Sequence, residues 1–131
     1  MFLVLLLSVV AVYAEGISNA KELAAFAKAV NKGEDISKWR NEKGHIYLDS
    51  DIDMAKMNKG APIKEFKGTF DGKGHALLNW KTKQGLFELI TENSTVQNLR
   101  IDSSCSMTVS TKVEQVIAGF IAAVNKGIIQ N

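Results

Sequence analysis

The sequence predicts an all-β fold with one helix, specifically a right-handed parallel β-helix (β-solenoid) capped by an N-terminal amphipathic helix. Two internal similarities predict it. The order apolar-x-Asn occurs at Leu77–Asn79, Val96–Asn98 and Ile129–Asn131, and Gly85–Ile90 resembles Gly119–Val124. Repeats of this size indicate stacked units, none of which buries its apolar face alone. No helical pattern separates the units, and crossovers between parallel strands are right-handed in nearly all proteins.

The central stretch, Phe66–Thr82, contains two strand-like runs around the turn Asp71-Gly72-Lys73-Gly74. Aspartate and glycine reach positive φ at low cost, so a sharp corner is expected there. Strand side chains alternate between faces, which predicts that Phe66 and Phe70 lie on the same face.

At these residues the chain resembles bacterial cell-surface proteins that carry GLUG repeats. The resemblance rests on the Gly-Thr-Phe-Asp-Gly-Lys-Gly-His run within Phe66–Trp80 and on the triplet Gly85–Phe87. Upstream, Ile17–Gly33 and Asp51–Asp53 also match the way such proteins begin. The resemblance implies a parallel β-helix, a surface location and an interaction role.

The first 14 residues resemble a secretion signal. Phe2–Val12 is apolar apart from Ser8 and is too short to span a bilayer, and cleavage after Ala14 is expected. The alternative is a buried strand, which the abrupt end of the run at Glu15 disfavours. We therefore expect a signal peptide over 1–14, a secreted or cell-surface location, and no membrane insertion after the signal is removed.

The charge pattern points to no nucleic-acid partner. Sixteen basic and fourteen acidic residues are interspersed along the chain, without a basic cluster in the sequence. The single cysteine, Cys105, has no partner for an internal disulfide. It is either a small buried hydrophobe or pairs with a chain segment outside this sequence.

Residues 15–44 are expected to form the helical cap and a loop. Ser18 can cap a helix over Ser18–Lys32, which Gly33 can close. The side chains at i, i+3, i+4 and i+7 form one apolar stripe: Leu23, Phe26, Ala27 and Val30. The alternative is a membrane-surface or partner helix, which the small, Ala-rich apolar face disfavours.

Residues 45–131 are expected to form the first coils of the β-helix. His45–Asp49 predicts a strand with Ile46 and Leu48 facing inward. The acidic run Asp49–Asp53 resembles the start of a calcium loop, but Met54 occupies the position that requires Gly, so the EF-hand interpretation fails.

The repeat spacing predicts an asparagine ladder and a fragment. Asn79, Asn98 and Asn131 hold equivalent places, and stacked amides would bond from coil to coil. Ser103–Lys112 is expected to be a short strand or hairpin inserted between coils. Because the last repeat stops at Asn131, we expect the chain to be truncated and to contact further coils of its own chain.

We find no catalytic, metal or cofactor residues in the sequence. His45 and His75 are the only histidines, and His75 follows a glycine turn, where a corner residue is a simpler interpretation than a base. A lone cysteine leaves no metal-ligating Cys/His set. The acids that accompany turns are not placed at catalytic separation by the sequence: Asp49, Asp51, Asp53, Asp71 and Asp102.

Two functions follow from these observations. The first is a non-catalytic exported module for adhesin-like surface recognition, or a structural scaffold, whose ligand is a protein or a glycan. The second is the N-terminal portion of a secreted peptidase or polysaccharide-cleaving enzyme. A protease or lyase motif beyond Asn131 would favour the second.

Overall fold

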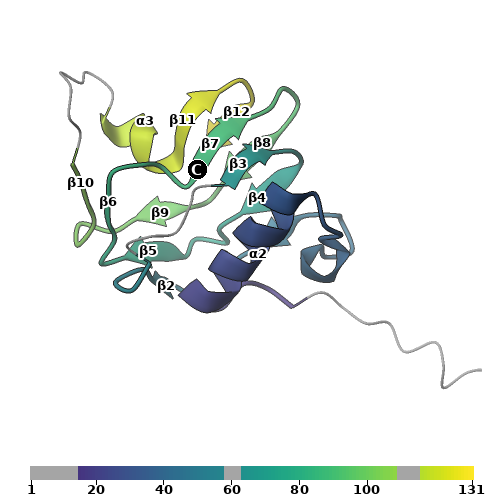
Figure 1. The fold of residues 1–131 in the computed structure, drawn as a ribbon, viewed down its shortest axis with the longest axis horizontal. Helices are drawn as coiled ribbons and strands as arrows, with labels where there is room; N and C mark the ends of the chain where they lie inside the picture. Colours follow the sequence, from purple (N-terminus) through teal and green to yellow (C-terminus); the bar gives the residue numbers. More distant parts are fainter. Residues whose placement is uncertain (1–14, 58–62, 109–115) are drawn as a thin grey trace, which may run out of the picture.

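The computed structural model describes residues 15–57, 63–108 and 116–131. These residues form mostly short parallel strands, divided among several small sheets, with one long helix against them (Figure 1). The helical segments are α2 (Ala20–Lys32), the 3-10 turn η1 (Ser37–Trp39) and α3 (Val116–Ile121). The strands are β1 (Ile46–Tyr47), β2 (Ile52–Asp53), β3 (Ile63–Phe66), β4 (Thr69–Asp71), β5 (Ala76–Leu78), β6 (Lys81–Thr82), β7 (Phe87–Ile90), β8 (Thr95–Gln97), β9 (Arg100–Ile101), β10 (Ser106–Met107), β11 (Ala122–Asn125) and β12 (Ile128–Gln130).

Helix α2 begins two residues later than the sequence predicted. Asn19, not Ser18, is the N-cap, and its side-chain oxygen accepts the backbone N–H of Glu22. The Glu22 carboxylate in turn accepts the N–H of Ser18 at 2.8 Å, which satisfies a second free donor. Gly33 ends the helix with φ of 70°, the left-handed conformation expected at this position.

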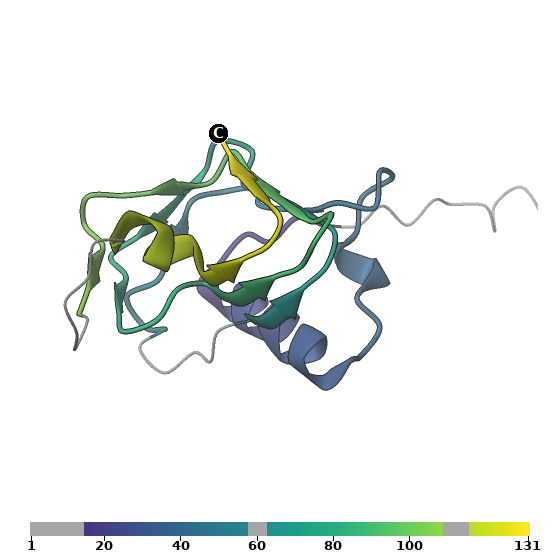
Figure 2. The same cartoon turned by 90° about the horizontal axis from the view of Figure 1, so that it is seen from above.

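One face of α2 is buried against the strands. Leu23 and Phe26 are fully buried, and Ala29 joins the predicted stripe, while Val30 lies at its half-buried margin. The ring of Phe26 packs edge-on against Trp39, with the centroids 5.5 Å apart. Figure 2 shows α2 lying along one flank of the strands.

The described strands pair in parallel in four sheets. The sheet orders are β1-β4-β8-β12, β3-β7-β11, β2-β5-β9 and β6-β10. Successive members of a sheet come from distant parts of the chain: Phe70 pairs with Val96, and Val96 pairs with Ile129. The chain therefore passes from sheet to sheet and returns to each sheet later.

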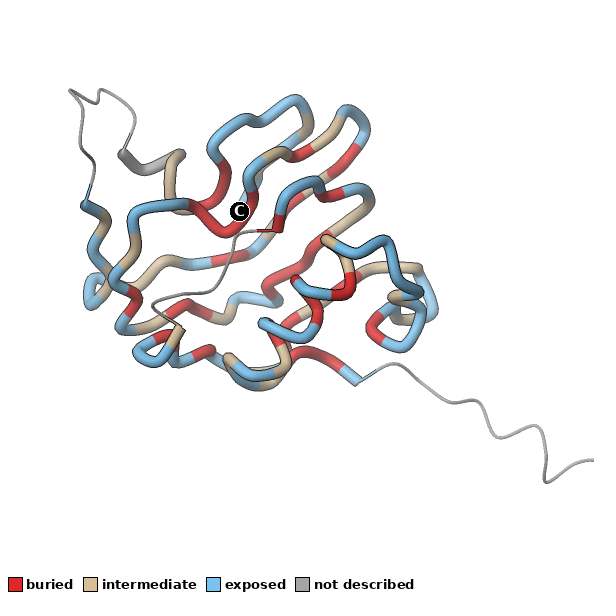
Figure 3. The backbone as a smooth tube through the Cα atoms, viewed as in Figure 1, coloured by how far each residue is buried: buried red, intermediate tan, exposed pale blue. Residues whose placement is uncertain are grey.

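The sheets share one apolar core (Figure 3). Phe66 and Phe70 are buried as predicted, with ring centroids 6.0 Å apart, but they lie in different sheets because the chain bends at Gly68, where φ is 113°. Phe87 packs 5.0 Å from Phe66. Ile46 and Leu48 face inward, as the alternation near β1 predicted.

The predicted right-handed parallel β-helix is wrong. The described strands are only two to four residues long and are divided among small sheets, and no β-helix or solenoid is detected. The prediction assumed that the units consist of short strands and turns with no helix between them. Instead, α3 lies between β10 and β11. The prediction that the N-terminal helix caps a solenoid is therefore also wrong. Helix α2 packs mainly along β3.

The predicted asparagine ladder is also wrong. Asn79 and Asn98 both have positive φ, 57° and 53°, but they lie at different corners. Asn98 follows β8, where its neighbours in register are Gly72 and Asn131, whereas the Asn79 N–H donates to the Ser104 hydroxyl. Asn79 and Asn98 therefore occupy different corners and cannot stack on each other, although Asn131 does lie against the Asn98 corner, where its side-chain oxygen accepts the Leu99 N–H at 3.1 Å.

The turn at Asp71–Gly74 is the corner that the sequence predicted. Lys73 and Gly74 have positive φ, and the Asp71 carboxylate accepts the Lys73 N–H at 2.8 Å. Gly72 is required by space: a Cβ there would lie 2.5 Å from the Asn98 carbonyl oxygen. Two chain layers therefore touch at this corner.

Two predictions fall outside the described residues, namely the signal peptide at 1–14 and the part of the Ser103–Lys112 insertion at 109–112. Within that insertion, Ser106–Met107 forms β10, which pairs in parallel with β6. In the part of the chain that the structure describes, no helix has the length and apolar character needed to cross a membrane.

Candidate functional site

Most of the described aspartates close turns. In each case, a carboxylate oxygen accepts the N–H of the residue two positions later, as in Asp35 to Ser37, Asp53 to Ala55 and Asp102 to Ser104. The backbone bond is the main cause that lowers the pKa of Asp35 and of Asp53, and the Ser104 hydroxyl bond is the main one for Asp102. These groups stay ionised at neutral pH, so they do not serve as proton donors.

Asp71 performs the same role in a buried setting. Burial raises its pKa, but bonds from the Lys73 N–H and from the Gln97 and Asn98 amides outweigh it, so the pKa lies below the ordinary value. The Asn98 amide donates at 3.2 Å and the Gln97 amide at 3.1 Å. Asp71 is therefore a fully bonded structural carboxylate.

The structure brings together one acid and one histidine that the sequence did not connect. The Asp51 carboxylate lies 3.3 Å from Nδ1 of His75 and accepts the Ala76 N–H at 2.8 Å. The Ala76 bond is the largest cause that lowers the pKa of Asp51. No described serine, threonine or cysteine is hydrogen-bonded to the His75 ring, so a nucleophile–base pair is not assembled. Parallel pairing of β2 with β5 explains the proximity, and local sequence carries no signal for it.

The other reactive residues are dispersed. Cys105 is a free, half-buried thiol that donates to the Leu77 carbonyl oxygen at 3.2 Å. Cys105 packs against the margin of the core, which is similar to the predicted role of a small buried hydrophobic residue. In the turn before β1, the His45 carbonyl oxygen accepts the Asn41 N–H, and the His45 N–H donates to the Asn41 side-chain oxygen. Among residues 15–57, 63–108 and 116–131, no three His, Cys, Asp or Glu side chains could hold a metal ion.

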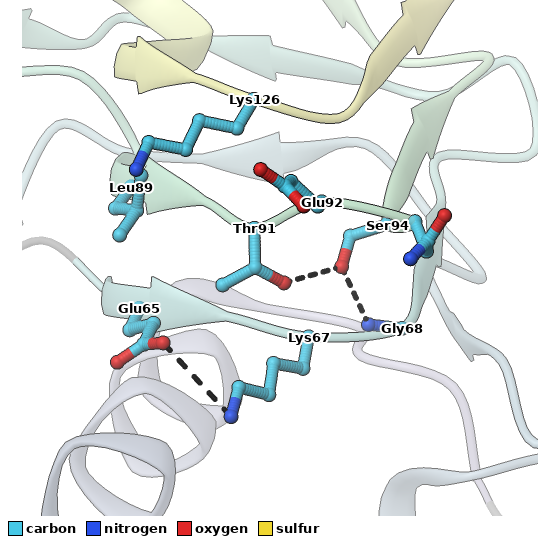
Figure 4. Close-up of a pocket in the computed structure, with 9 residues that line it drawn as sticks. Glu65, Lys67, Gly68, Leu89, Thr91, Glu92, Ser94 and Lys126 are labelled. Carbon is cyan, nitrogen blue, oxygen red and sulfur yellow. Dashed lines mark hydrogen bonds and ion pairs between the residues drawn. The ribbon is translucent and has the colours of Figure 1, made fainter.

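A groove of about 500 Å³ lies where β3 and β7 end, and we call it the β3–β7 groove. Figure 4 shows Glu65 and Lys67 on one side, the turn that carries Thr91 and Glu92 in the middle, and Lys126 above it. Leu89 contributes an apolar patch. The groove therefore combines two carboxylates, two ammonium groups and an aliphatic side chain, with a balanced formal charge.

The floor of the β3–β7 groove is fixed by hydroxyl groups. Thr91 and Ser94 share a hydrogen bond of 2.8 Å, and the Ser94 oxygen accepts the Gly68 N–H at 3.1 Å (Figure 4). Ser94 is 2% exposed, so this bond ties two chain layers together beneath the groove. In contrast, the Glu65–Lys67 ion pair is 4.0 Å long and exposed, which leaves both charges available to a ligand.

The sequence did not predict the β3–β7 groove. Its residues come from three separate segments that parallel pairing of β3, β7 and β11 brings side by side. The polar turn Thr91–Ser94 was the only local signal. Comparison with known proteins found no matching family model, curated protein or solved structure. The resemblance to GLUG-repeat proteins therefore stays a prediction.

Proposed function

We propose that this chain is a non-catalytic, exported recognition module that binds a polar extracellular ligand, a protein segment or a glycan, in the β3–β7 groove. The observation that supports it is the groove itself, in which available charged side chains surround a floor fixed by hydrogen bonds. Because the floor is already fixed, the protein loses less conformational entropy when a ligand binds. Charges of both signs suit a neutral or zwitterionic chain.

The turn-closing role of the aspartates supports recognition over catalysis. Four carboxylates accept backbone N–H groups two residues on, and their pKa values are lowered. These four aspartates therefore stabilise turns of the backbone. Export rests on the apolar segment at 1–14 and is tested by N-terminal sequencing of the protein recovered from the producing cells and from their medium.

Binding is tested on the full chain by NMR titration with neutral chito-oligosaccharides and with an extended peptide that alternates Lys and Glu. We expect at least one probe to shift the amide signals of Gly68 and of the Thr91–Ser94 turn. Glu92→Gln combined with Lys126→Gln keeps the net charge and is expected to weaken binding by at least about tenfold, because charged hydrogen bonds are lost.

The matched control is Glu42→Gln with Lys43→Gln, an exposed pair in the turn before β1 that should leave binding unchanged. The proposal is wrong if neither probe shifts those amides, or if the groove variant binds as tightly as the control.

A further inference from the structure

Helix α2 carries a row of lysines on the face that points away from the core. Lys21, Lys28 and Lys32 are exposed, and positions seven and eleven apart return to nearly the same angle around a helix. At about 1.5 Å per residue, the row is about 16 Å long. Exposed Ala24 and Ala25 lie between the lysines and leave them accessible.

These lysines have no acidic partner among the described ion pairs. The ion pairs of the described residues join Lys67 to Glu65, Lys73 to Asp71 and His75 to Asp51. The acid of the first turn, Glu22, is turned toward the Ser18 N–H. Lys21, Lys28 and Lys32 thus form a positive strip without an ion-pair partner among the described residues, although the charges are interspersed in the sequence.

A groove of about 640 Å³ runs beside the N-terminal end of this row, and we call it the α2 groove. Its lining residues come from the first turns of α2 and from the turn after β2, and Figure 1 shows these two segments at the lower end of the helix. The α2 groove has no lining residue in common with the β3–β7 groove. Its lining includes Lys21, Lys56, Asp53, Ala20, Ala24 and Met57.

The side chains of the α2 groove present three kinds of chemistry. Lys21 and Lys56 supply ammonium groups from two different elements, and the alanines with Met57 supply a low apolar surface. Asp53 supplies a carboxylate that accepts the Ala55 N–H and the Asn79 amide. A carboxylate repels bare anions but accepts hydrogen bonds from hydroxyl groups. A fitting ligand therefore carries negative charges, hydroxyl groups and an apolar face together.

We propose that the α2 groove and the lysine row bind an acidic polysaccharide that carries carboxylates on its sugar units. One carboxylate pairs with Lys21 and Lys56, sugar hydroxyls donate to Asp53, and the chain continues along α2 toward Lys28 and Lys32. A membrane surface fits less well, because Leu23 and Phe26 are buried in the core and α2 exposes no large apolar side chain that could insert.

The test uses the full chain and alginate oligosaccharides, with the same oligosaccharides reduced at their carboxyl groups as the uncharged probe. Lys21→Gln with Lys56→Gln is expected to weaken alginate binding at least about tenfold, since two charge-assisted contacts are lost. Lys43→Gln with Lys83→Gln removes the same charge from two other exposed sites and should change binding less than about twofold.

Asp53→Asn separates this proposal from simple charge attraction. If Asp53 accepts sugar hydroxyls, the substitution weakens alginate binding although it removes a negative charge; general attraction to polyanions predicts tighter binding. A thermal melt checks that the Asp53→Asn variant is folded. Lys28→Gln with Lys32→Gln changes only the exposed face of α2, so its effect on alginate binding is measured without altering the turn that Asp53 closes.

The proposal is overturned if the reduced oligosaccharides bind as well as alginate, or if the control Lys43→Gln with Lys83→Gln loses as much binding as Lys21→Gln with Lys56→Gln. It is also overturned if only inorganic phosphate or vesicles with phosphatidylserine bind. Because the grooves share no residue, Glu92→Gln with Lys126→Gln leaves alginate binding intact whether or not the β3–β7 groove binds its own ligand.

Discussion

The Asp71 carboxylate accepts a hydrogen bond from the side-chain amide of Gln97 at 3.1 Å, and the two residues are register partners in β4 and β8. The Gln97 oxygen accepts in turn from the Gln130 amide at 3.2 Å, on the next strand of the same sheet. A buried charge therefore lies at one end of a line of aligned amides. Such lines strengthen their members, because each bond polarises the next.

We predict that Asp71→Asn destabilises the protein by about 1–3 kcal/mol at pH 7, because an NH2 group then replaces the carboxylate oxygen that accepts from Gln97, and this group can only donate. The folded-state pKa of Asp71 lies below its ordinary value of 3.8. Its stabilising effect is therefore present above about pH 4 and is lost as the pH falls through the folded value. The difference between the two proteins should shrink in acid, as measured by urea unfolding between pH 2 and 7.

Asp35→Asn is the control for this experiment. Asp35 also closes a turn, but it is exposed and bonds only to Ser37. An equal loss of stability in both variants would show that the amide line of Asp71 contributes nothing beyond the turn.

The contact between Gly72 and Asn98 predicts a steric effect. Gly72→Ala would place Cβ 2.5 Å from the Asn98 carbonyl oxygen, and that backbone atom moves only if β8 shifts. We expect a loss of about 1–3 kcal/mol, as for other overpacked sites. Gly74→Ala meets no atom within 4 Å, and its φ of 81° costs about 1–2 kcal/mol. Chemical shifts across β8 should change for the first variant only.

The buried face of α2 predicts a large effect at Phe26. This ring is fully buried against Trp39 and Phe70, so Phe26→Asp places a charge in the core and should abolish cooperative unfolding. Ala25→Asp introduces the same charge one residue earlier, on the exposed face, and should leave the melt within a few degrees of the parent. Equal solubility and cooperativity in both variants would contradict the packing described.

The left-handed conformation of Asn98 predicts a difference between two small substitutions. Asn98→Gly keeps the φ of 53° at low cost, whereas Asn98→Ala adds strain of about 1–2 kcal/mol. Both substitutions remove the amide that donates to Asp71, so the difference in stability between the two variants reports the cost of the backbone conformation. Thermal melts measure it, and similar stabilities would show that the corner relaxes.

Local features were predictable where they depend on neighbours in the chain. The spacing of Leu23 and Phe26 identified the helix face, and Gly33 identified its end, whereas Ser18 and Asn19 both suit an N-cap. The phase of the strands was not predictable from one motif. Asn79 and Asn98 belong to similar local motifs, and both corners need positive φ. The strands that precede them nevertheless pair in different sheets, and the pairing of β4 with β8 aligns Asn98 with Gly72.

Both grooves depend on long-range pairing and so were missed. The β3–β7 groove needs Lys126 beside Leu89, and the α2 groove needs Lys56 beside Lys21. In the sequence these residues are separated by other elements, and Lys21 and Lys56 each have an acidic neighbour, Glu22 and Asp53. Only the packing of α2 against the strands shows that Lys21 and Lys56 line the same groove.

The parallel pairing has a consequence for how fast this protein reaches its native state. The shortest steps between partners in the parallel strands, such as Ile46 to Phe70, enclose a loop of about two dozen residues, and each loop costs closure entropy before its first contact forms. Helix α2 has only local bonds and can form in about a microsecond, while the strands have no partner nearby. Folding is therefore expected in the millisecond-to-second range, with α2 present early as a surface on which the first strands collect.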